Sequence, residues 1–190
     1  RDGVDLILVF PTEASLEAKE ATNGTEIPVL SLASYVEGNG LINSIKRPGG
    51  NITGVRFPIA EVAAKRLEIL HEIAPLAKRI WVPNLKGYPT VAPSLKALNV
   101  VALKYGLTIV DQGFATPAEM ASYLAARKVG DAGMDAVLLI PEPVSIIPDF
   151  ANQIVEFADA RKLPMAGVVV QESDRGPIFS LIPTALEFGR

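Results

Sequence analysis

The sequence predicts an α/β protein in which helices cover both faces of parallel β-sheets. Short continuous apolar runs, the pattern of strands buried on both faces, alternate with longer segments of helical periodicity. The connections between these segments are short, as in doubly wound folds. A glycine-rich stretch interrupts the alternation once, and the alternation then restarts. This interruption favours two half-sized sheets over one long sheet.

The first half of the chain opens with an apolar run at residues 4–10, which predicts a strand covered on both faces. Pro11 stops this strand, and Thr12 is placed to cap a helix over residues 13–22. Residues 27–32 form a second apolar run and predict a second buried strand.

The glycine-rich stretch follows, and it leads into a strongly amphipathic helix. Within the stretch, residues 40–46 predict one short helical turn and residues 51–57 predict a strand. The helix is predicted over residues 61–73. The apolar side chains that we expect to face inward are Val62, Leu67, Ile69, Leu70 and Ile73. His71, near the end of this helix, favours a surface or capping role, because a helix C-terminus stabilises a cation.

The second half repeats the alternation. Strands are predicted over residues 79–82, 107–110, 136–140, 165–170 and 178–182. Helices are predicted over residues 90–105, from Thr116 onward, and over 148–161. Gly106 ends the first of these helices, and Thr116, followed by proline and glutamate, caps the second. Thr184 is predicted to cap a last helix.

Two positions in the first strand of this half carry separate expectations. Trp81 lies within the predicted strand and favours a core position over a ligand platform. Pro83 and Asn84 are predicted to form the exit of the strand.

This order predicts two lobes joined by more than one crossing of the chain. Residues 1–74 are predicted to form a partial first lobe with a crossover helix, residues 75–172 a second lobe, and residues 173–190 a return to the first lobe. The boundary is expected near residues 74–78, and the return near residues 171–177.

Composition excludes several classes of function. Among 190 residues, 49% are hydrophobic, which is enough for a real core, and the formal net charge of −3 argues against nucleic acid as a partner. Cysteine is absent and histidine occurs once, which leaves almost nothing for a metal site or a serine–histidine triad. Neither a dinucleotide glycine motif nor a nucleophile motif follows a strand. We therefore expect no catalytic residues, no metal and no cofactor.

The ends of the chain predict a fragment of a longer protein. A strand begins almost at residue 1, and a helix has barely begun at residue 190. No signal peptide is present, and no apolar run reaches the roughly 18 residues that span a bilayer.

Polar and aromatic residues follow the predicted strands. In open parallel sheets, ligands bind outside the carboxyl ends of the strands, and small polar groups there suit a small polar molecule. The predicted ligand site consists of Thr12, Glu13, Ser34, Tyr35, Asn84, Tyr88, Glu142 and Gln171.

Each of these residues has a functional and a structural interpretation. Thr12 stands at a helix N-terminus, where a carboxylate can dock, although it can equally cap its own helix. Glu13 can hold the ammonium group of a ligand. Glu142, on a stiff loop between two prolines, can do the same or face water. Tyr35 and Tyr88 can stack on a planar ligand or serve as rim packing.

Four runs of the sequence form a distinctive set: Val4-Asp5-Leu6-Ile7, Arg47-Pro48-Gly49-Gly50-Asn51-Ile52-Thr53-Gly54, Lys65-Arg66-Leu67-Glu68-Ile69-Leu70 and Ile73-Ala74-Pro75. With these runs, the chain resembles the tryptophan/tyrosine-type substrate-binding proteins of ABC transporters over nearly its whole length. Three positions depart from the family pattern: Ser34-Tyr35 stands where the family carries Asp-Pro, Asn84-Leu85 where it often carries Asn-Pro, and Pro141-Glu142 where it often carries Pro-Asp. Because the departures fall on pocket loops, the ligand does not carry over.

The resemblance implies a periplasmic-binding-protein-like type I fold with two Rossmann-like lobes, of which the first is incomplete. It implies capture of a small polar solute between the lobes, in some members an aromatic amino acid, and delivery to a membrane permease. It also implies a periplasmic or membrane-anchored extracytoplasmic location. The alternative is a ligand-sensing domain of a signalling protein with the same fold.

Overall fold

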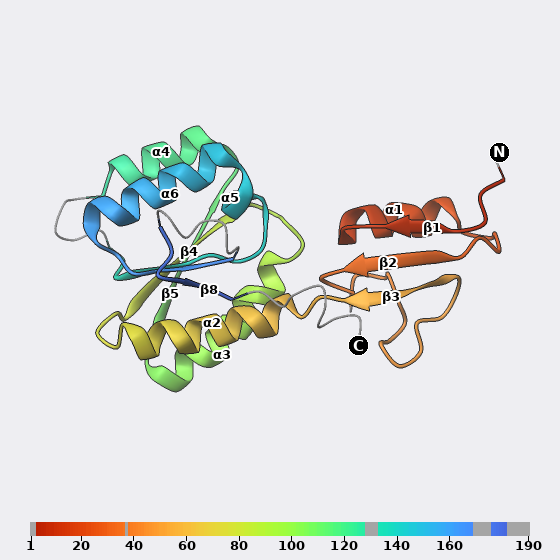
Figure 1. The fold of residues 1–190 in the computed structure, drawn as a ribbon, viewed down its shortest axis with the longest axis horizontal. Helices are drawn as coiled ribbons and strands as arrows, with labels where there is room; N and C mark the ends of the chain where they lie inside the picture. Colours follow the sequence, from red (N-terminus) through yellow and green to blue (C-terminus); the bar gives the residue numbers. More distant parts are fainter. Residues whose placement is uncertain (1–2, 37, 128–132, 169–175, 182–190) are drawn as a thin grey trace. The chain divides into compact units, whose positions relative to one another are not determined.

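The computed structural model describes residues 3–36, 38–127, 133–168 and 176–181. The chain divides into two compact units, Arg1–Pro58 and Ile59–Arg190. Each unit is an α/β body, and every strand pairing within it is parallel (Figure 1). The predicted fold class is therefore confirmed.

The first unit holds a three-stranded sheet of order β1-β2-β3. Its elements are β1 (Ile7–Val9), α1 (Thr12–Ala21), β2 (Val29–Ala33) and β3 (Ile52–Arg56). Side chains from α1 and from the inward positions of the strands form the core on one face, with Val29 and Ala33 fully buried. The loop between β2 and β3 adds Leu41 to this core, and Lys19 of α1 holds that loop by donating to the Leu41 carbonyl (3.0 Å).

The other face of this sheet differs from the prediction. Leu6, Leu8 and Phe10 were expected to be buried, but they are 54%, 67% and 63% exposed. The expectation is wrong because α1 lies on the opposite face, and no second helix of the described residues packs here. Residues 40–46 form bends and turns in place of the predicted helical turn.

The second unit holds a five-stranded sheet of order β5-β4-β6-β7-β8. Helices cover both of its faces, with α2 and α3 on one side and α4, α5 and α6 on the other (Figure 1). The elements are α2 (Ile59–Ile73), β4 (Arg79–Leu85), α3 (Val91–Tyr105), β5 (Thr108–Phe114), α4 (Pro117–Ala125), β6 (Ala136–Leu138), α5 (Pro143–Ile146), α6 (Pro148–Arg161), β7 (Met165–Gly167) and β8 (Phe179–Ser180).

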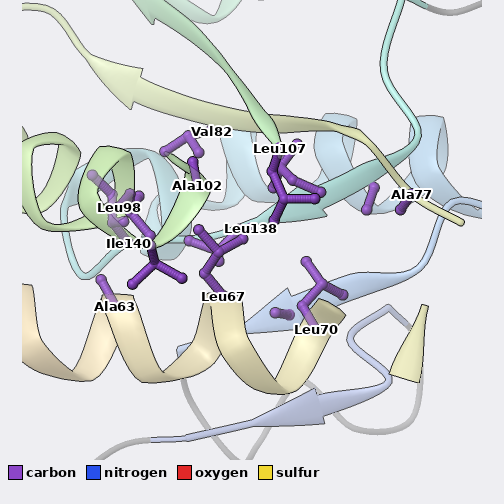
Figure 2. Packing of buried hydrophobic residues seen from close by; sticks show 14 of the residues in the cluster. Ala63, Leu67, Leu70, Ala77, Val82, Leu98, Ala102, Leu107, Leu138 and Ile140 are labelled. Carbon is purple, nitrogen blue, oxygen red and sulfur yellow. The ribbon is translucent and has the colours of Figure 1, made fainter. Parts of the chain in front are cut away.

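A hydrophobic core lies on each face of this sheet. Figure 2 shows one of them, where Leu67 of α2 and Leu98 of α3 meet strand side chains such as Leu138. The other core centres on Trp81, which is fully buried as predicted, with ring centroids 5.8 Å from Phe157.

Helix α2 differs from the prediction in two ways. Its buried positions are Ala63, Arg66, Leu67 and Leu70, and Ile73 is exposed. Because α2 packs closely on α3, the division of the chain falls before this helix, not near residues 74–78. His71, near its end, packs its ring against Tyr105 with centroids 4.8 Å apart.

Strand β4 is longer than predicted, because it runs through Pro83 and Asn84 to Leu85. Its pairing with β6 involves only Ile80 and Trp81, so the later part of β4 pairs with β5 alone. A proline, which has no N–H to donate, is tolerated where one side of a strand is unpaired. Pro83 therefore does not end the strand.

The helix ends predicted at Thr116 and Gly106 are confirmed. The Thr116 hydroxyl accepts from the Glu119 N–H (3.2 Å) at the start of α4, and Gly106 adopts the left-handed conformation after α3. Thr184 lies outside the described residues. None of the described helices is both long enough and apolar enough to span a membrane.

Candidate functional site

The predicted site residues of the first unit gather at the carboxyl ends of β1 and β2. Thr12 begins α1 directly after β1, and it is only 1% exposed. Its hydroxyl oxygen accepts from the backbone N–H of Ser34 (3.0 Å) and of Tyr35 (3.3 Å), which follow β2. The structure therefore brings Thr12, Ser34 and Tyr35 together.

This arrangement corrects the capping interpretation of Thr12. The residue at the N-cap of α1 is Pro11, which makes no side-chain capping hydrogen bond. A hydroxyl offers two acceptor lone pairs, and the two backbone donors of Thr12 use both. Thr12 thus holds the loop after β2 against the start of α1, and this loop carries the half-buried Ser34 and Tyr35.

Glu13 adds an acceptor in the first turn of α1. Its Oε1 atom is buried and has no hydrogen-bond partner among the described residues. A carboxylate accepts hydrogen bonds and donates none, and a buried acceptor without a partner is costly. Glu13 is therefore suited to receive an N–H donor.

The predicted residues of the second unit gather around Leu85, at the carboxyl end of β4. The Leu85 N–H donates to Glu142 Oε2 (3.0 Å), and the Leu85 carbonyl accepts from the Tyr88 N–H (3.1 Å). Asn84 precedes Leu85, is buried, and donates from Nδ2 to Asp111 Oδ1 (2.7 Å). Three predicted residues from two strand ends thus meet at one point.

Glu142 is buried and accepts two backbone hydrogen bonds in this structure. It is 4% exposed, and its Oε1 accepts from the Val144 N–H (3.1 Å) at the start of α5. Ser145 Oγ in turn accepts from the Glu142 N–H, which completes a capping box. Burial raises the pKa of Glu142 to about 7, although the two backbone donors oppose the shift. The interpretation of Glu142 as a side chain that faces water is therefore wrong, and its pairing with a ligand ammonium group stays a prediction.

The remaining site residue, Gln171, lies outside the described residues. No cluster of acidic, histidine or cysteine side chains in the described ranges could hold a metal ion.

A groove of about 710 Å³ lies elsewhere in the second unit, lined by residues that include Leu76, Arg79 and Pro164. It contacts none of the described site residues, and it lies at the amino ends of the strands, where ligands of such sheets do not bind.

Sequence reasoning missed three residues that organise the carboxyl edge of the five-stranded sheet. Thr90 donates from its hydroxyl to the Pro141 carbonyl (3.3 Å), and Asp111 Oδ1 accepts a hydrogen bond from Asn84 Nδ2. Arg66 donates to carbonyls at two strand ends. Its spacing from Leu70 and Ala63 puts it on the buried stripe of α2, and that spacing was the available signal.

Comparison with known proteins identifies the family. The family of ABC transporter substrate binding proteins matches residues 1–190, the whole chain. The chain belongs to this family.

Several relatives of this substrate-binding family have known structures or curated descriptions. A tyrosine-binding protein of Clostridioides difficile (strain R20291) is 26% identical over 164 residues, which cover 86% of this chain and 45% of that protein. An ABC domain from Streptococcus pneumonia in complex with L-Trp is similar with a TM-score of 0.78 at 21% identity, covering 99% of this chain and 62% of that one. A ligand-free, open substrate-binding protein with adhesive properties from Clostridium difficile gives a TM-score of 0.58 at 26% identity, covering 85% and 52%. The chain thus spans about half to two thirds of the length of these relatives.

The residues that most resemble the family sequence have structural contacts within the first unit. Asn51 donates from Nδ2 to the Ile27 carbonyl (2.6 Å) and to Thr22 Oγ1 (2.9 Å), which ties β3 to the end of α1. A Cβ atom at Gly54 would lie 1.7 Å from the Ser31 carbonyl oxygen of the neighbouring strand. These residues therefore shape the sheet whose carboxyl edge carries Ser34 and Tyr35.

Proposed function

We propose that this protein is the solute-binding component of an ABC importer and that its solute is an amino acid, with aromatic amino acids preferred. The observation that carries the proposal is the group formed by Thr12, Glu13, Ser34 and Tyr35 at one sheet edge of a chain in this family. The preference for aromatic amino acids draws on relatives described as binding tyrosine and L-Trp.

The chemistry of this group suits an α-amino acid. The buried oxygen of Glu13 has no donor among the described residues, and an ammonium group supplies charged N–H donors. Ser34 offers a hydroxyl for the solute carboxylate, and the ring of Tyr35 offers an apolar face for an aromatic side chain. Thr12 contributes by holding the loop in place.

We further propose that the solute binds between the two lobes, with Asn84, Tyr88 and Gln171 as the contribution of the second lobe. Each lobe presents polar residues at the carboxyl ends of parallel strands, where ligands of such sheets bind. Closure of the lobes on the solute is then favoured by contacts that form only in the closed state. The initial domain prediction placed a return to the first lobe at residues 173–190, whereas β8 (Phe179–Ser180) pairs with β7 in the sheet of the second unit.

The remaining parts of the proposal follow from the family. The partner is a membrane permease that receives the solute, and the protein works outside the cytoplasm, in the periplasm or anchored to the membrane. It holds the solute without transforming it, so a bound solute is expected to be recovered unchanged. Neither a nucleic acid nor a cofactor takes part.

A thermal-shift screen followed by calorimetry tests the proposal. L-tyrosine, L-tryptophan and L-leucine are compared with a purine and a sugar; a solute at about 100 times its Kd stabilises by about 2.7 kcal/mol. The substitution Glu13→Gln is expected to weaken the affinity for the amino acid that binds best by about tenfold or more, since charged hydrogen bonds are worth about 1.5–3 kcal/mol. Glu17→Gln, an exposed position on the same helix, is the matched control.

A second arm identifies the group that Glu13 binds. The same aromatic solute without its amino group, for example 3-(4-hydroxyphenyl)propionate in place of tyrosine, is measured against both variants. Glu13→Gln should leave the affinity for this analogue within about twofold, because no ammonium group is lost. Equal loss for both solutes would refute the assigned role of Glu13, and no stabilisation by any amino acid would overturn the proposed function.

A further inference from the structure

Arg66 of α2 is a buried cation at the carboxyl edge of the five-stranded sheet. It is 0% exposed. Its Nε donates to the Leu181 carbonyl (2.8 Å), and its Nη1 donates to the Leu139 carbonyl (2.8 Å). Its Nη2 is buried and has no hydrogen-bond partner among the described residues.

Within the described residues, no ion pair balances the charge of this guanidinium. No acidic side chain of the described ranges forms a salt bridge with Arg66. Burial lowers its pKa to about 10, which still leaves it protonated at neutral pH. A buried charge is expensive, and an apolar residue of similar volume often gives an equally stable or more stable fold. Stability alone therefore does not account for an arginine at this position.

The two carbonyls that Arg66 holds are both at strand ends. Leu139 directly follows β6 and Leu181 directly follows β8, although these residues lie 73 and 115 positions away from Arg66 in the sequence. Arg66 therefore fixes two strand exits to one helix. Carboxyl ends of parallel strands are where ligand-binding loops begin.

The segment that leaves β6 is held at further points. Leu139 begins it, Pro141 accepts from the Thr90 hydroxyl, and Glu142 accepts from the Leu85 N–H beside Asn84. The Arg66 contact lies at the root of this segment, upstream of the other two. A shift of Leu139 would therefore displace Glu142 and, through Leu85, the end of β4.

We propose that Arg66 is a positioning residue for the solute site: it fixes the segment of residues 139–142 and the exit of β8, so that its loss weakens solute binding beyond its effect on stability. The affinity part of this proposal rests on the proposed function. The positional part concerns only the described contacts and can be tested without a solute.

The opposite edge of the same sheet offers a matched control. Arg79, at the amino end of β4, donates from Nη2 to Asp135 Oδ1 (2.7 Å), just before β6. Each arginine makes two or more hydrogen bonds, and at least one of them goes to a residue that flanks β6. They differ in the edge at which they do so, and only the Arg66 edge carries predicted site residues.

The experiment compares Arg66→Met, Arg66→Lys and Arg79→Met in the full chain. Hydrogen exchange of peptides covering residues 137–145 and 177–181 is measured without solute, together with the melting temperature and the Kd for L-tyrosine and L-tryptophan. We expect Arg79→Met to lower the melting temperature by a few degrees and Arg66→Met to change it less, because an apolar residue of similar volume replaces a buried charge. Only Arg66→Met should speed exchange at residues 139–142 and raise Kd, by about tenfold or more. Arg66→Lys keeps the charge and one donor nitrogen. Its exchange rate at residues 139–142 and its Kd should therefore lie between those of Arg66→Met and the wild type.

The outcomes separate this proposal from the proposed function. Unchanged exchange at residues 139–142 in both Arg66 variants overturns the positional part, whether or not a solute is known. A Kd that stays within about twofold in Arg66→Met, with a melting temperature lowered as in Arg79→Met, reduces Arg66 to a structural residue. If wild-type protein binds neither amino acid, the proposed function fails, and hydrogen exchange alone decides the role of Arg66.

Discussion

The two sheets of this protein are built from similar apolar strands but are covered differently. In the five-stranded sheet, β4 is buried along its central residues, and helices lie on both faces (Figure 1). In the three-stranded sheet, α1 covers one face, and Leu6 and Leu8 of the other face are exposed. An apolar run therefore predicts a strand. Whether both faces of that strand are buried depends on which helices pack against the sheet.

The difference also concentrates the buried core in one unit. The second unit holds the large cores around Trp81 and around Leu67. The first unit has a small core, and Glu13 there has a buried acceptor without a partner among the described residues. Substitutions of buried residues in the second unit should therefore cost more stability than substitutions in the first, and the following predictions test this from the largest effect to the smallest.

Trp81→Ala should give the largest loss of stability. Trp81 is fully buried between Tyr123 and Phe157, with ring centroids at 6.2 Å and 5.8 Å. Removal of a buried Trp side chain costs about 3–5 kcal/mol of unfolding free energy. Urea denaturation followed by circular dichroism measures it, since the variant has no tryptophan left to fluoresce.

Trp81→Phe is the control for this prediction. It keeps an aromatic ring and removes the indole N–H, which has no hydrogen-bond partner among the described residues. Because a buried unpaired donor is costly, the phenylalanine variant should retain most of the stability. Equal losses in the two variants would mean that volume does not explain the role of Trp81.

Glu142→Gln should change how stability depends on pH. The pKa of Glu142 is raised from 4.5 to about 7 in the folded protein, so the folded state holds a proton that the unfolded state loses. This group therefore contributes stability at low pH that is lost as the pH rises from 4.5 to 7. The loss amounts to about 3 kcal/mol and should be absent in Glu142→Gln. Fluorescence of Trp81 during urea denaturation at several pH values measures it.

Asp135→Asn is the control of opposite sign. Its hydrogen bonds with Arg79 lower the pKa of Asp135 from 3.8 to about 2, so its contribution is present above pH 3.8 and is lost as the pH falls through 2. Both variants should therefore approach the wild type in stability at low pH, where the carboxyl group is neutral. At neutral pH the wild type should be more stable than Asp135→Asn and less stable than Glu142→Gln. Parallel pH profiles for wild type and Glu142→Gln would show that Glu142 titrates normally.

The sequence predicted the order of the elements well, because periodicity, caps and turns are local signals. Thr116 caps the start of α4 and Gly106 follows the end of α3, as predicted. The errors arose where tertiary contacts decide. Pro83 stays within β4 because β6 is too short to pair there, and Leu8 is exposed because its face has no described helix.

The sequence predicted which residues of the candidate site lie together, but not which hydrogen bonds their side chains make. The rule that ligands bind at carboxyl ends of strands brought together Thr12, Ser34 and Tyr35, and it brought Asn84 together with Glu142. It could not show that the oxygens of Thr12 and Glu142 are occupied by backbone donors. These hydrogen bonds involve donors far away in the sequence, and no sequence motif predicts them.

Gly54→Ala should destabilise the first unit and leave the second unit unchanged. The added Cβ would meet the Ser31 carbonyl of β2, so the β2–β3 pairing must shift. Overpacking of this kind costs about 1–3 kcal/mol. Circular dichroism should report the loss, whereas the fluorescence of Trp81, which lies in the second unit, should keep its midpoint.

Gly113→Ala is the matched control, since it also places a Cβ within a strand. Its close neighbours include side-chain atoms of Asn84 and Lys86, which can move by a few tenths of an ångström. We expect a smaller loss than for Gly54→Ala. A larger loss in Gly113→Ala would show that the backbone approach at Gly54 is not the tighter constraint.

Leu8→Ala should have the smallest effect, and it tests the comparison of the two sheets most directly. Leu8 in β1 is 67% exposed, so its truncation should change the unfolding free energy by less than about 0.5 kcal/mol. Leu138→Ala makes the same chemical change at a fully buried position of β6 and should cost about 2–5 kcal/mol. If Leu8→Ala costs as much as Leu138→Ala, the outer face of β1 is covered in solution, and concentration dependence of the loss would assign that covering to a second copy of the chain.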